Sequence, residues 1–347
     1  MDNLLRAIRF EKPDYIPTTF HISPACYNAY PRDALFDLME GHRFLFPGFK
    51  RPDADWALQF GRGARKDEPY TDAFGCVWTT STDGIFGTVT KHPLADWAAF
   101  KAWRCPDPEK DNGIYPIDWA AEKCRIDGEK TTGRTVSASL WHGHTFLRLC
   151  DLRGYENLLF DFADEDPRIF KLIERLEWFN TEIVKRYLSF GVDIMGYPED
   201  LGMQTGPMLS PQQFKKYIKS VYQRMMKPAR DKGAAVHMHS DGDIRLLADD
   251  LVEGGVEVIN LQDLVNGIDW IAKRFAGKVC IELDIDRQSI TAQGTPAQID
   301  ALIREEVEKL GSRQGGLMMV FGLYPGTPLK NIAALMDAME KYATYYT

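Results

Sequence analysis

Hydrophobic and polar positions alternate in a regular rhythm from about residue 130 to the end of the chain. Short β-rich runs are separated by longer segments in which apolar residues recur at helical spacing. Strands that alternate with helices in this way predict a parallel α/β fold. The expected strands, including one earlier run, cover residues 16–23, 135–141, 193–199, 234–241, 256–262, 278–286 and 316–323.

Side-chain chemistry at the helix starts supports this rhythm. Four expected helices begin with a capping residue followed directly by proline: Asp166-Pro167, Ser210-Pro211, Thr295-Pro296 and Thr327-Pro328. A capping oxygen satisfies a free backbone N–H, and proline at the first helical position loses no hydrogen bond. The second and third also carry a glutamine three residues after the cap, which is a capping-box pattern. A further helix is expected from near Asp243 to Gly254-Gly255.

Seven βα-like units around one core predict an α/β protein with the architecture of a (β/α)8 TIM barrel. The sequence does not place the eighth strand. No linker, charge block or internal repeat marks a boundary, so we expect residues 1–347 to form a single barrel domain. Residues 50–95 break the rhythm, and Asp83-Gly84 predicts a β-hairpin inserted after the first strand, at about 70–92. Such an insertion would lie over one mouth of the barrel.

Composition excludes several classes of protein. The chain is 44% hydrophobic and 27% charged, which is typical of a globular protein with a large core. Its 42 Lys and Arg against 50 Asp and Glu provide no basic surface for nucleic acid or anionic lipid. No long apolar run or secretory signal is present, so we expect a cytoplasmic protein. The six scattered cysteines predict free thiols and no zinc knuckle.

The strongest candidate site is at the end of the strand expected over residues 234–241. His237, His239 and Asp241 point to one face because side chains alternate along a strand. Two imidazoles and a carboxylate on one face can bind zinc or act as an acid–base pair. The alternative is structural, with Asp241 and Asp243 forming a turn and His237 lying in the core.

A second candidate follows the strand expected over residues 193–199. Glu199 can ligate the same metal or take part in catalysis, and Tyr197 and Gln204 are expected to contact substrate. The alternative is a solvated loop with a capping aspartate.

Three acids on one face of another strand form the third candidate. Glu282, Asp284 and Asp286 would be costly to bury without partners, so Asp284 is expected to line the cavity and Asp286 to cap a turn. The glycine between two histidines after residue 141 allows the backbone to approach a ligand closely. The remaining residues expected to contact substrate are His21, Tyr27, Trp141, His142 and His144.

Several common catalytic motifs are missing from the sequence. It contains no GxGxxG after a strand, no GxxxxGK, no GxSxG and no HExxH. Nucleotide-dependent enzymes, serine hydrolases and zinc proteases of these types therefore lose support.

Four segments together resemble the uroporphyrinogen decarboxylase superfamily over nearly the whole chain. They are LLRAIRFEKPDYIP, EDLGMQTGPMLSPQQFKKYI, the run His239-Ser240-Asp241-Gly242-Asp243-Ile244, and the run Leu323-Tyr324-Pro325-Gly326-Thr327-Pro328. The resemblance implies a (β/α)8 barrel. It also implies one of two activities: decarboxylation of uroporphyrinogen, or cobalamin-dependent methyl transfer.

Charge favours the methyltransferase branch. In the decarboxylase branch an arginine-rich segment follows the first strand, because the substrate carries eight carboxylates. This chain has no Arg or Lys between Lys12 and Arg32. The methyltransferase branch carries two zinc-binding cysteines, and these positions align with Asp241 and Phe321. Sulfur ligation is therefore lost, and His239 and Asp241, with His237 or Glu199, can bind zinc through nitrogen and oxygen or work without metal.

The resulting hypothesis is a corrinoid-dependent methyltransferase. It would remove a methyl group from a small methoxylated or methylated compound, such as an aryl methyl ether, and pass it to a separate corrinoid protein. His239, Asp241 and Glu199 would be the catalytic residues, since an alkoxide or phenoxide leaves poorly without an acid or metal.

Two alternatives and one question stay open. The chain can instead be a decarboxylase or lyase acting on a small carboxylic acid or a tetrapyrrole-related substrate through His and Asp acid–base chemistry. It can also be a non-catalytic barrel that binds a corrinoid or tetrapyrrole. The oligomeric state, a homodimer included, is not set by the sequence.

Overall fold

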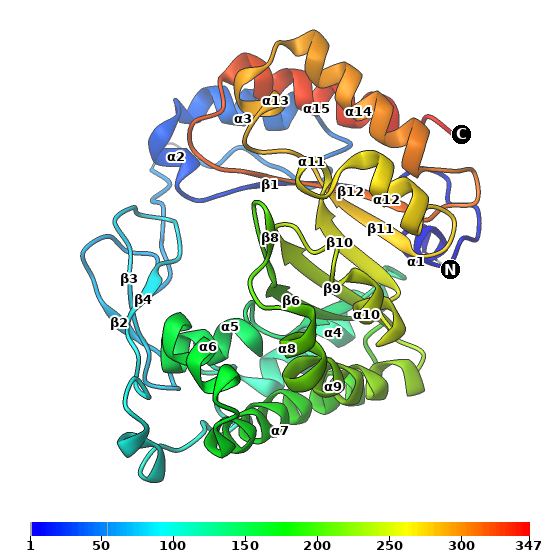
Figure 1. The fold of residues 1–347 in the computed structure, drawn as a ribbon. Coiled ribbons are helices and arrows are strands. Elements are labelled where there is room, and N and C mark those ends of the chain that lie inside the picture. Colours follow the sequence, from blue (N-terminus) through cyan, green and yellow to red (C-terminus); the bar gives the residue numbers. More distant parts are fainter. Residues whose placement is uncertain (1, 54) are drawn as a thin grey trace.

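A curled parallel sheet of seven strands forms the centre of the computed structural model, which describes residues 2–53 and 55–347 (Figure 1). Its strands run in the order β1-β12-β11-β10-β9-β6-β5. All seven predicted strands are confirmed, and within the described residues no eighth strand joins this sheet. The bounds are Thr18–Ile22 (β1), Ser137–Ser139 (β5), Ile194–Asp200 (β6), Ala235–Asp241 (β9), Val258–Gln262 (β10), Cys280–Asp284 (β11) and Leu317–Leu323 (β12).

Helices cover the outer side of this sheet. In Figure 1, α7 and α9 lie against the half that contains β6 and β9, and α14 and α15 lie against the half that contains β1 and β12. The fold is thus α/β and resembles a TIM barrel opened between β1 and β5. The main covering helices are Trp119–Thr131 (α4), Phe146–Arg153 (α5), Tyr155–Ala163 (α6), Pro167–Ser189 (α7), Ser220–Asp231 (α9), Ala248–Glu253 (α10), Ile268–Phe275 (α12), Pro296–Leu310 (α14) and Leu329–Ala343 (α15).

Shorter helical segments connect these elements. They are Asn3–Ile8 (α1), Cys26–Ala29 (α2), Arg32–Gly41 (α3), Trp97–Lys101 (η1), Pro211–Gln213 (α8), Phe214–Lys219 (η2), Asp263–Asn266 (α11) and Ile290–Gln293 (α13). Helix α1 closes the amino-terminal end of the sheet, where Leu5 and Ile8 pack against Ile194, Val258 and Met318. Burying this apolar layer leaves the carboxyl ends of the strands as the open end.

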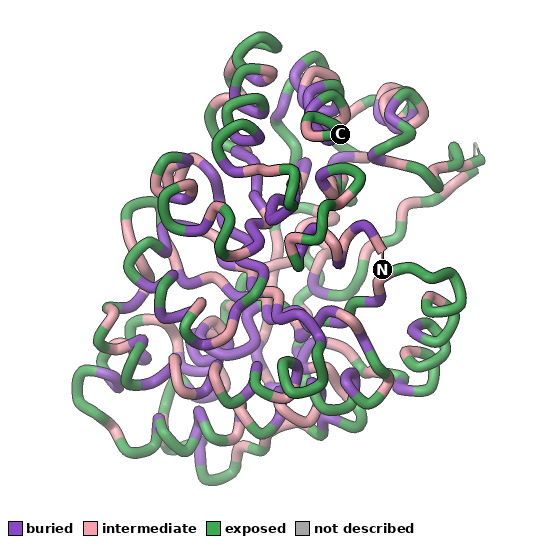
Figure 2. The backbone as a smooth tube through the Cα atoms, turned by 90° about the vertical axis from the view of Figure 1, so that its right-hand side faces the viewer, coloured by how far each residue is buried: buried purple, intermediate pink, exposed green. Residues whose placement is uncertain are grey.

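The predicted capping signals act at most of the helix starts. Asp166 caps α7, and the boxes at Ser210 and Thr295 form at α8 and α14. Two of the expected helix starts lie before the observed ones. The helix expected from Asp243 begins at Ala248, because Asp243 instead bonds Arg245, and α15 begins at Leu329 without a side-chain cap. Figure 2 shows the buried segments running through the middle of the molecule and the exposed ones on the outer helical turns.

The insertion after β1 is an antiparallel sheet of three short strands. Its strands are Tyr70–Thr71 (β2), Val77–Thr79 (β3) and Thr88–Lys91 (β4), so the expected two-stranded hairpin is too simple. The turn at Gly84 has φ +83° and packs so closely that a Cβ there would lie 2.5 Å from the backbone nitrogen of Ala25. Because Ala25 follows β1, this contact places the insertion at the open end of the main sheet.

Two further observations concern the whole chain. All six cysteines are free. None of the helices in the described part of the chain combines the length and the apolarity needed to cross a membrane.

Candidate functional site

Three polar side chains from three elements converge at the carboxyl ends of the strands. Nε2 of His142 lies 3.3 Å from Oδ1 of Asp200, and Nε2 of His239 lies 3.5 Å from the same oxygen. The three atoms that could ligate a metal all lie within 4.8 Å of one another. His142 follows β5, whereas Asp200 ends β6 and His239 lies on β9. Barrel enzymes place their catalytic groups at this end of the strands. We call these residues the His142–Asp200–His239 cluster.

Strand register explains why Asp200 belongs to the cluster. In the parallel β6–β9 ladder, Pro198 pairs with His239 and Asp200 pairs with Asp241. Paired residues on neighbouring strands face the same side of a sheet, so Asp200 and His239 share the inner face. The sequence contained this signal, because Gly196 and Pro198 share the face of Asp200, whereas the large residues Met195 and Tyr197 share the face of Glu199.

Two glycines bring the ends of β6 and β9 into direct contact. A Cβ on Gly242 would lie 2.1 Å from the carbonyl carbon of Gly202. Gly242 also has φ +83°, a conformation that glycine adopts without steric cost. The N–H of Asp243 donates to the carbonyl of Met203 at 2.7 Å. The glycine after Asp241 therefore locks together the two strand ends that carry the cluster.

The ring of His239 is held in one orientation by Asn260. The amide nitrogen of Asn260 donates to the carbonyl of Glu282 at 2.8 Å, so its Oδ1 accepts a hydrogen bond from Nδ1–H of His239. Nε2 of His239 is then directed at Asp200, with Oδ1 of Asp241 at 3.7 Å. Fixing one ring nitrogen leaves the other available as a ligand or a proton carrier.

Electrostatics in the cluster strongly favours a positive charge between the carboxylates. Burial alone would lower the pKa of His239, but Asp200 and Asp241 outweigh it and raise this pKa to about 9. Burial would raise the pKa of Asp200, yet the two histidines hold it well below its usual range. The pKa of His142 is raised by Asp200 against the effect of burial. These shifts all favour a positive charge at this position, which a proton on His239 or a metal ion could supply.

The donor set of the cluster fits zinc. Zinc is held by imidazole nitrogen and carboxylate oxygen, and catalytic zinc sites have three protein ligands with a further position open. Two imidazole Nε2 atoms and one carboxylate oxygen supply these donors here, and Asn260 fixes the tautomer of one ring. The His142–Asp200–His239 cluster can therefore hold zinc without any cysteine.

Arg287 binds the two other acids at this end of the strands. Its Nη2 lies 3.1 and 3.2 Å from the two carboxylate oxygens of Asp241 and 3.0 Å from Oδ2 of Asp284. Burial raises the pKa of Asp284, and Arg287 opposes this shift. Asp241 and Asp284 thus lie beside the cluster but are neutralised by an arginine that sequence reasoning did not identify.

The predicted catalytic and metal-binding role of Glu199 does not fit the structure. Its carboxylate faces the helices and accepts hydrogen bonds from the backbone N–H groups of Thr145, Phe146 and Leu147 at 2.8–3.1 Å. It also accepts one from the hydroxyl of Tyr222 at 2.7 Å. Glu199 is completely buried and caps the start of α5. It therefore positions the loop that carries His142 instead of joining the cluster.

Two expected substrate contacts are buried in the same helix–sheet layer. Tyr197 is fully buried, and its hydroxyl donates to the carbonyl of Met225 at 3.2 Å. His144 packs against Tyr222, with ring centroids 5.4 Å apart, and burial lowers its pKa to about 3. Both predictions are wrong for the same reason: these side chains point to the outer face, away from the cluster.

His237 lies on the inner face, one step deeper along β9 than His239. Its Nε2 lies 2.6 Å from Oε2 of Glu282, so it forms a separate pair and does not complete the metal cluster. His21 on β1 is exposed, and its charge helps to lower the pKa of Glu282. His237 and Glu282 line a separate cavity that also includes Leu4 and Met318.

The remaining predicted contacts are scattered around the open end. Tyr27 on α2 packs against Phe36 and Trp56, with ring centroids 5.9 and 5.4 Å away. Gln204 is exposed in the turn between Gly202–Met203 (β7) and Gly206–Pro207 (β8). Asp286 caps the turn that follows it, as expected, by accepting from the N–H groups of Gln288 and Ser289.

A cavity of about 440 Å³ adjoins the cluster, and Trp141 lines it as the sequence predicted. It lies between the inserted β3–β4 strands and the loop before α5. Five of its eleven lining residues come from the insertion, whose position over the cluster depends on packing that the sequence pattern does not show. The lining residues are Trp78, Phe86, Gly87, Thr88, Val89, Trp141, His142, Gly143, Leu147, Asp151 and Asp200.

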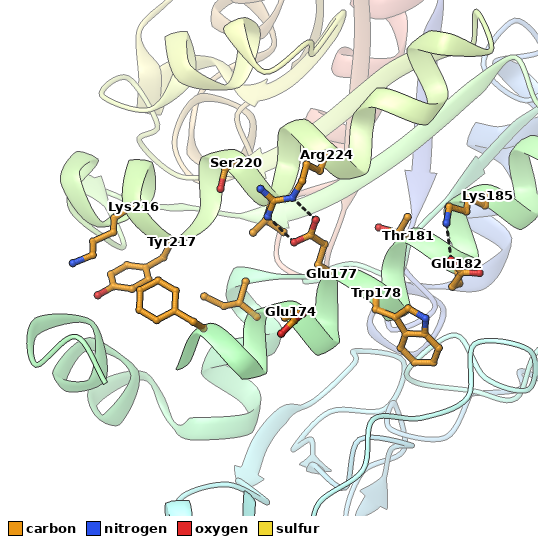
Figure 3. Close-up of a pocket in the computed structure, with 13 residues that line it drawn as sticks. Glu174, Glu177, Trp178, Thr181, Glu182, Lys185, Lys216, Tyr217, Ser220 and Arg224 are labelled. Carbon is orange, nitrogen blue, oxygen red and sulfur yellow. Dashed lines mark hydrogen bonds and ion pairs between the residues drawn. The ribbon is translucent and has the colours of Figure 1, made fainter. Parts of the chain in front are cut away.

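A second hollow lies on another face of the molecule. A groove of about 590 Å³ runs between α7 and the η2–α9 segment on the outside of the barrel (Figure 3). Arg224 and Glu177 bridge it through two contacts of 2.5 and 2.7 Å, and Lys185 pairs with Glu182 at 2.8 Å. These groups are already paired with one another, and none of the cluster residues lines this groove.

Comparison with known proteins identifies the family of the chain. Residues 70–342 match the family described as uroporphyrinogen decarboxylase (URO-D). A uroporphyrinogen decarboxylase from Thermus thermophilus is 25% identical over 188 residues, which are 52% of this chain and 50% of that protein. The chain therefore aligns with about half the length of that relative.

A solved structure extends the likeness over the whole chain. A methyltransferase from Methanosarcina mazei superposes with a TM-score of 0.62 and 16% identity, over 98% of both chains. This shows a common fold. Because the family match covers most of the sequence, the chain belongs to the uroporphyrinogen decarboxylase family.

Proposed function

We propose that this protein is a methyltransferase that takes a methyl group from a small methoxylated or methylated compound. The methyl group passes to a corrinoid carried by a partner protein. The observation that carries the proposal is the His142–Asp200–His239 cluster beside an apolar cavity at the open end of the strands. The likeness to a methyltransferase fold supports it.

The cluster residues would hold zinc through Nε2 of the two histidines and Oδ1 of Asp200. Zinc bound there would act as a Lewis acid that stabilises the negative charge left on the donor oxygen when its bond to the methyl group breaks and the methyl group passes to the corrinoid cobalt. Asn260 orients His239, and Glu199 fixes the start of α5 next to the loop that bears His142. Trp141 and the inserted strands shield the adjoining cavity.

Charge in the site disfavours a substrate with many carboxylates. The one arginine that lies beside the cluster in the described part of the chain is Arg287, and Asp241 and Asp284 already occupy it. A polyanion would need several unpaired cations. This favours methyl transfer from a small donor over decarboxylation of uroporphyrinogen.

The test is a methyl-transfer assay with free reduced cobalamin as acceptor and a panel of methoxybenzenes, methanol and methylamines as donors. We expect zinc-loaded enzyme to methylate the cobalamin, as its absorption spectrum reports, with at least one donor. Asp200→Asn should lower the rate about a hundredfold or more, whereas the outward-facing Glu177→Gln should not change it. No methylation with any donor would contradict the proposal.

A second candidate is a decarboxylase or lyase that acts on a small carboxylic acid. The close pairing of His239 with Asp200 favours it, because such a pair can move a proton, and the family match includes decarboxylases. Release of CO2 from a carboxylic acid in the absence of any cobalamin would support this candidate and displace the first.

A further inference from the structure

The cavity beside the cluster has an aromatic wall built mainly by the insertion. Trp78 and Phe86 have ring centroids 4.9 Å apart, and Phe86 and Trp141 have centroids 5.7 Å apart. These rings pack against one another and form a continuous wall instead of a box around a central point. Such a wall suits a flat ring, which can stack or meet the wall edge to face. The volume of about 440 Å³ lies in the range of ordinary ligand pockets.

Asp151 gives this apolar cavity an acidic group. It lies on α5 and lines the cavity together with His142 and Asp200. Within the described residues, no hydrogen bond reaches its carboxyl oxygens, and its nearest cation is Arg148 at 3.5 Å. About a fifth of the Asp151 side chain stays exposed, so its carboxylate can accept a further hydrogen bond from a ligand in the cavity.

The neighbours of Asp151 show what kind of donor it needs. Arg148 is held by Asp72 at 2.7 Å, and the indole N–H of Trp78 donates to the same aspartate at 2.8 Å. These donors are therefore already used. Because Arg148 also supplies positive charge beside Asp151, a neutral O–H donor suits the site better than a second cation.

We propose that the cavity binds the ring of a methoxylated phenol, with a ring hydroxyl donating to Asp151. The methoxy group is then directed toward the His142–Asp200–His239 cluster, two of whose residues, His142 and Asp200, line the same cavity. The inference rests on the proposed function and names its substrate class. Asp151 is a specificity-determining residue in this account, and the insertion supplies the ring-binding wall.

The test measures binding alone, so it needs no corrinoid. The purified protein is titrated with the three methoxyphenol isomers, with methoxybenzene and with tetramethylammonium, and the fluorescence of Trp78 and Trp141 reports occupancy. We expect at least one methoxyphenol to bind about tenfold or more tightly than methoxybenzene. Asp151→Ala should remove this difference and leave methoxybenzene unchanged.

Two further variants serve as controls for a general loss of folding. Phe86→Leu should weaken methoxyphenol and methoxybenzene alike, because both use the wall. Asp164→Ala, which removes an exposed acid at the end of α6, should change neither. The proposal is overturned if the methoxyphenols bind no better than methoxybenzene, if Asp151→Ala keeps the preference, or if tetramethylammonium binds most tightly.

The binding result separates this inference from the proposed function. Binding that depends on Asp151, without methyl transfer, would keep the pocket assignment and reject the function. Methyl transfer from donors that lack a ring, without methoxyphenol binding, would keep the proposed function and reject the pocket assignment.

Discussion

Oδ1 of Asp200 lies 3.3 Å from Nε2 of His142, although the two residues belong to the ends of different strands. The same oxygen lies 3.5 Å from His239, so one carboxylate joins two imidazoles. This relationship, and not the expected set of His239 and Asp241 with His237 or Glu199, defines the candidate centre.

Glu199 is a structural residue, and its removal should cost stability without removing the metal site. Glu199→Ala leaves three buried backbone N–H groups and the Tyr222 hydroxyl without their acceptor. We expect a loss of about 3 kcal/mol or more in the free energy of unfolding, measured by urea denaturation. Tyr222→Phe, which removes one of these bonds, should cost about 1 kcal/mol. Equal stability of Glu199→Ala and wild type would contradict the capping role.

Arg287 should stabilise the protein through its ion pairs with two aspartates. Arg287→Met leaves Asp241 and Asp284 facing each other without a cation in a half-buried site, so we expect a loss of about 3 kcal/mol. The matched control is Arg274→Met, since Arg274 pairs with Asp249 at the surface and should contribute under about 1 kcal/mol. Thermal and urea unfolding of both variants measure the difference, and equal effects would refute it.

Glu306 should make stability depend on pH. Burial, and then the charge of Asp263, raise the pKa of Glu306 well above its usual value. The folded chain thus keeps a proton that the unfolded chain releases above about pH 4.3. This contribution is complete below that pH and is lost as pH rises toward the folded pKa.

Glu306→Gln keeps a neutral side chain at every pH and should remove this dependence. We expect the variant to be more stable than wild type at pH 8 by about 1 kcal/mol or more, and the difference to shrink toward pH 4. Glu305→Gln changes the exposed neighbour and should not alter the profile. Parallel profiles of wild type and Glu306→Gln in urea unfolding would show that Glu306 is not protonated in the folded chain.

The sequence predicted the fold well because its signals are local. Alternation of β-rich and amphipathic runs located all seven strands, and the caps at Asp166, Ser210 and Thr295 located helix starts. The start expected at Asp243 failed because an aspartate can bond a nearby arginine as readily as it caps a helix. The first inserted strand, β2, is only two residues long and is too short for a pattern to show.

The site was harder to predict because it depends on which face each strand turns inward. On β9 the sequence predicted correctly which side chains face inward, so His239 and Asp241 lie at the open end as expected. On β6 the choice of Glu199 over Asp200 was an error of one position, which moves a side chain to the opposite face. Asp151 gave no sequence signal, since its place in the cavity depends on how the insertion packs.

The most direct test of the account is the zinc content and zinc affinity of purified protein and single variants. We predict about one zinc per chain in wild type and its loss in His142→Ala, Asp200→Ala and His239→Ala. His237→Ala should keep the metal, because His237 pairs with Glu282 away from the cluster. Zinc that is absent from wild type, or that is lost in His237→Ala but kept in Asp200→Ala, would contradict the assignment of the His142–Asp200–His239 cluster as the metal centre.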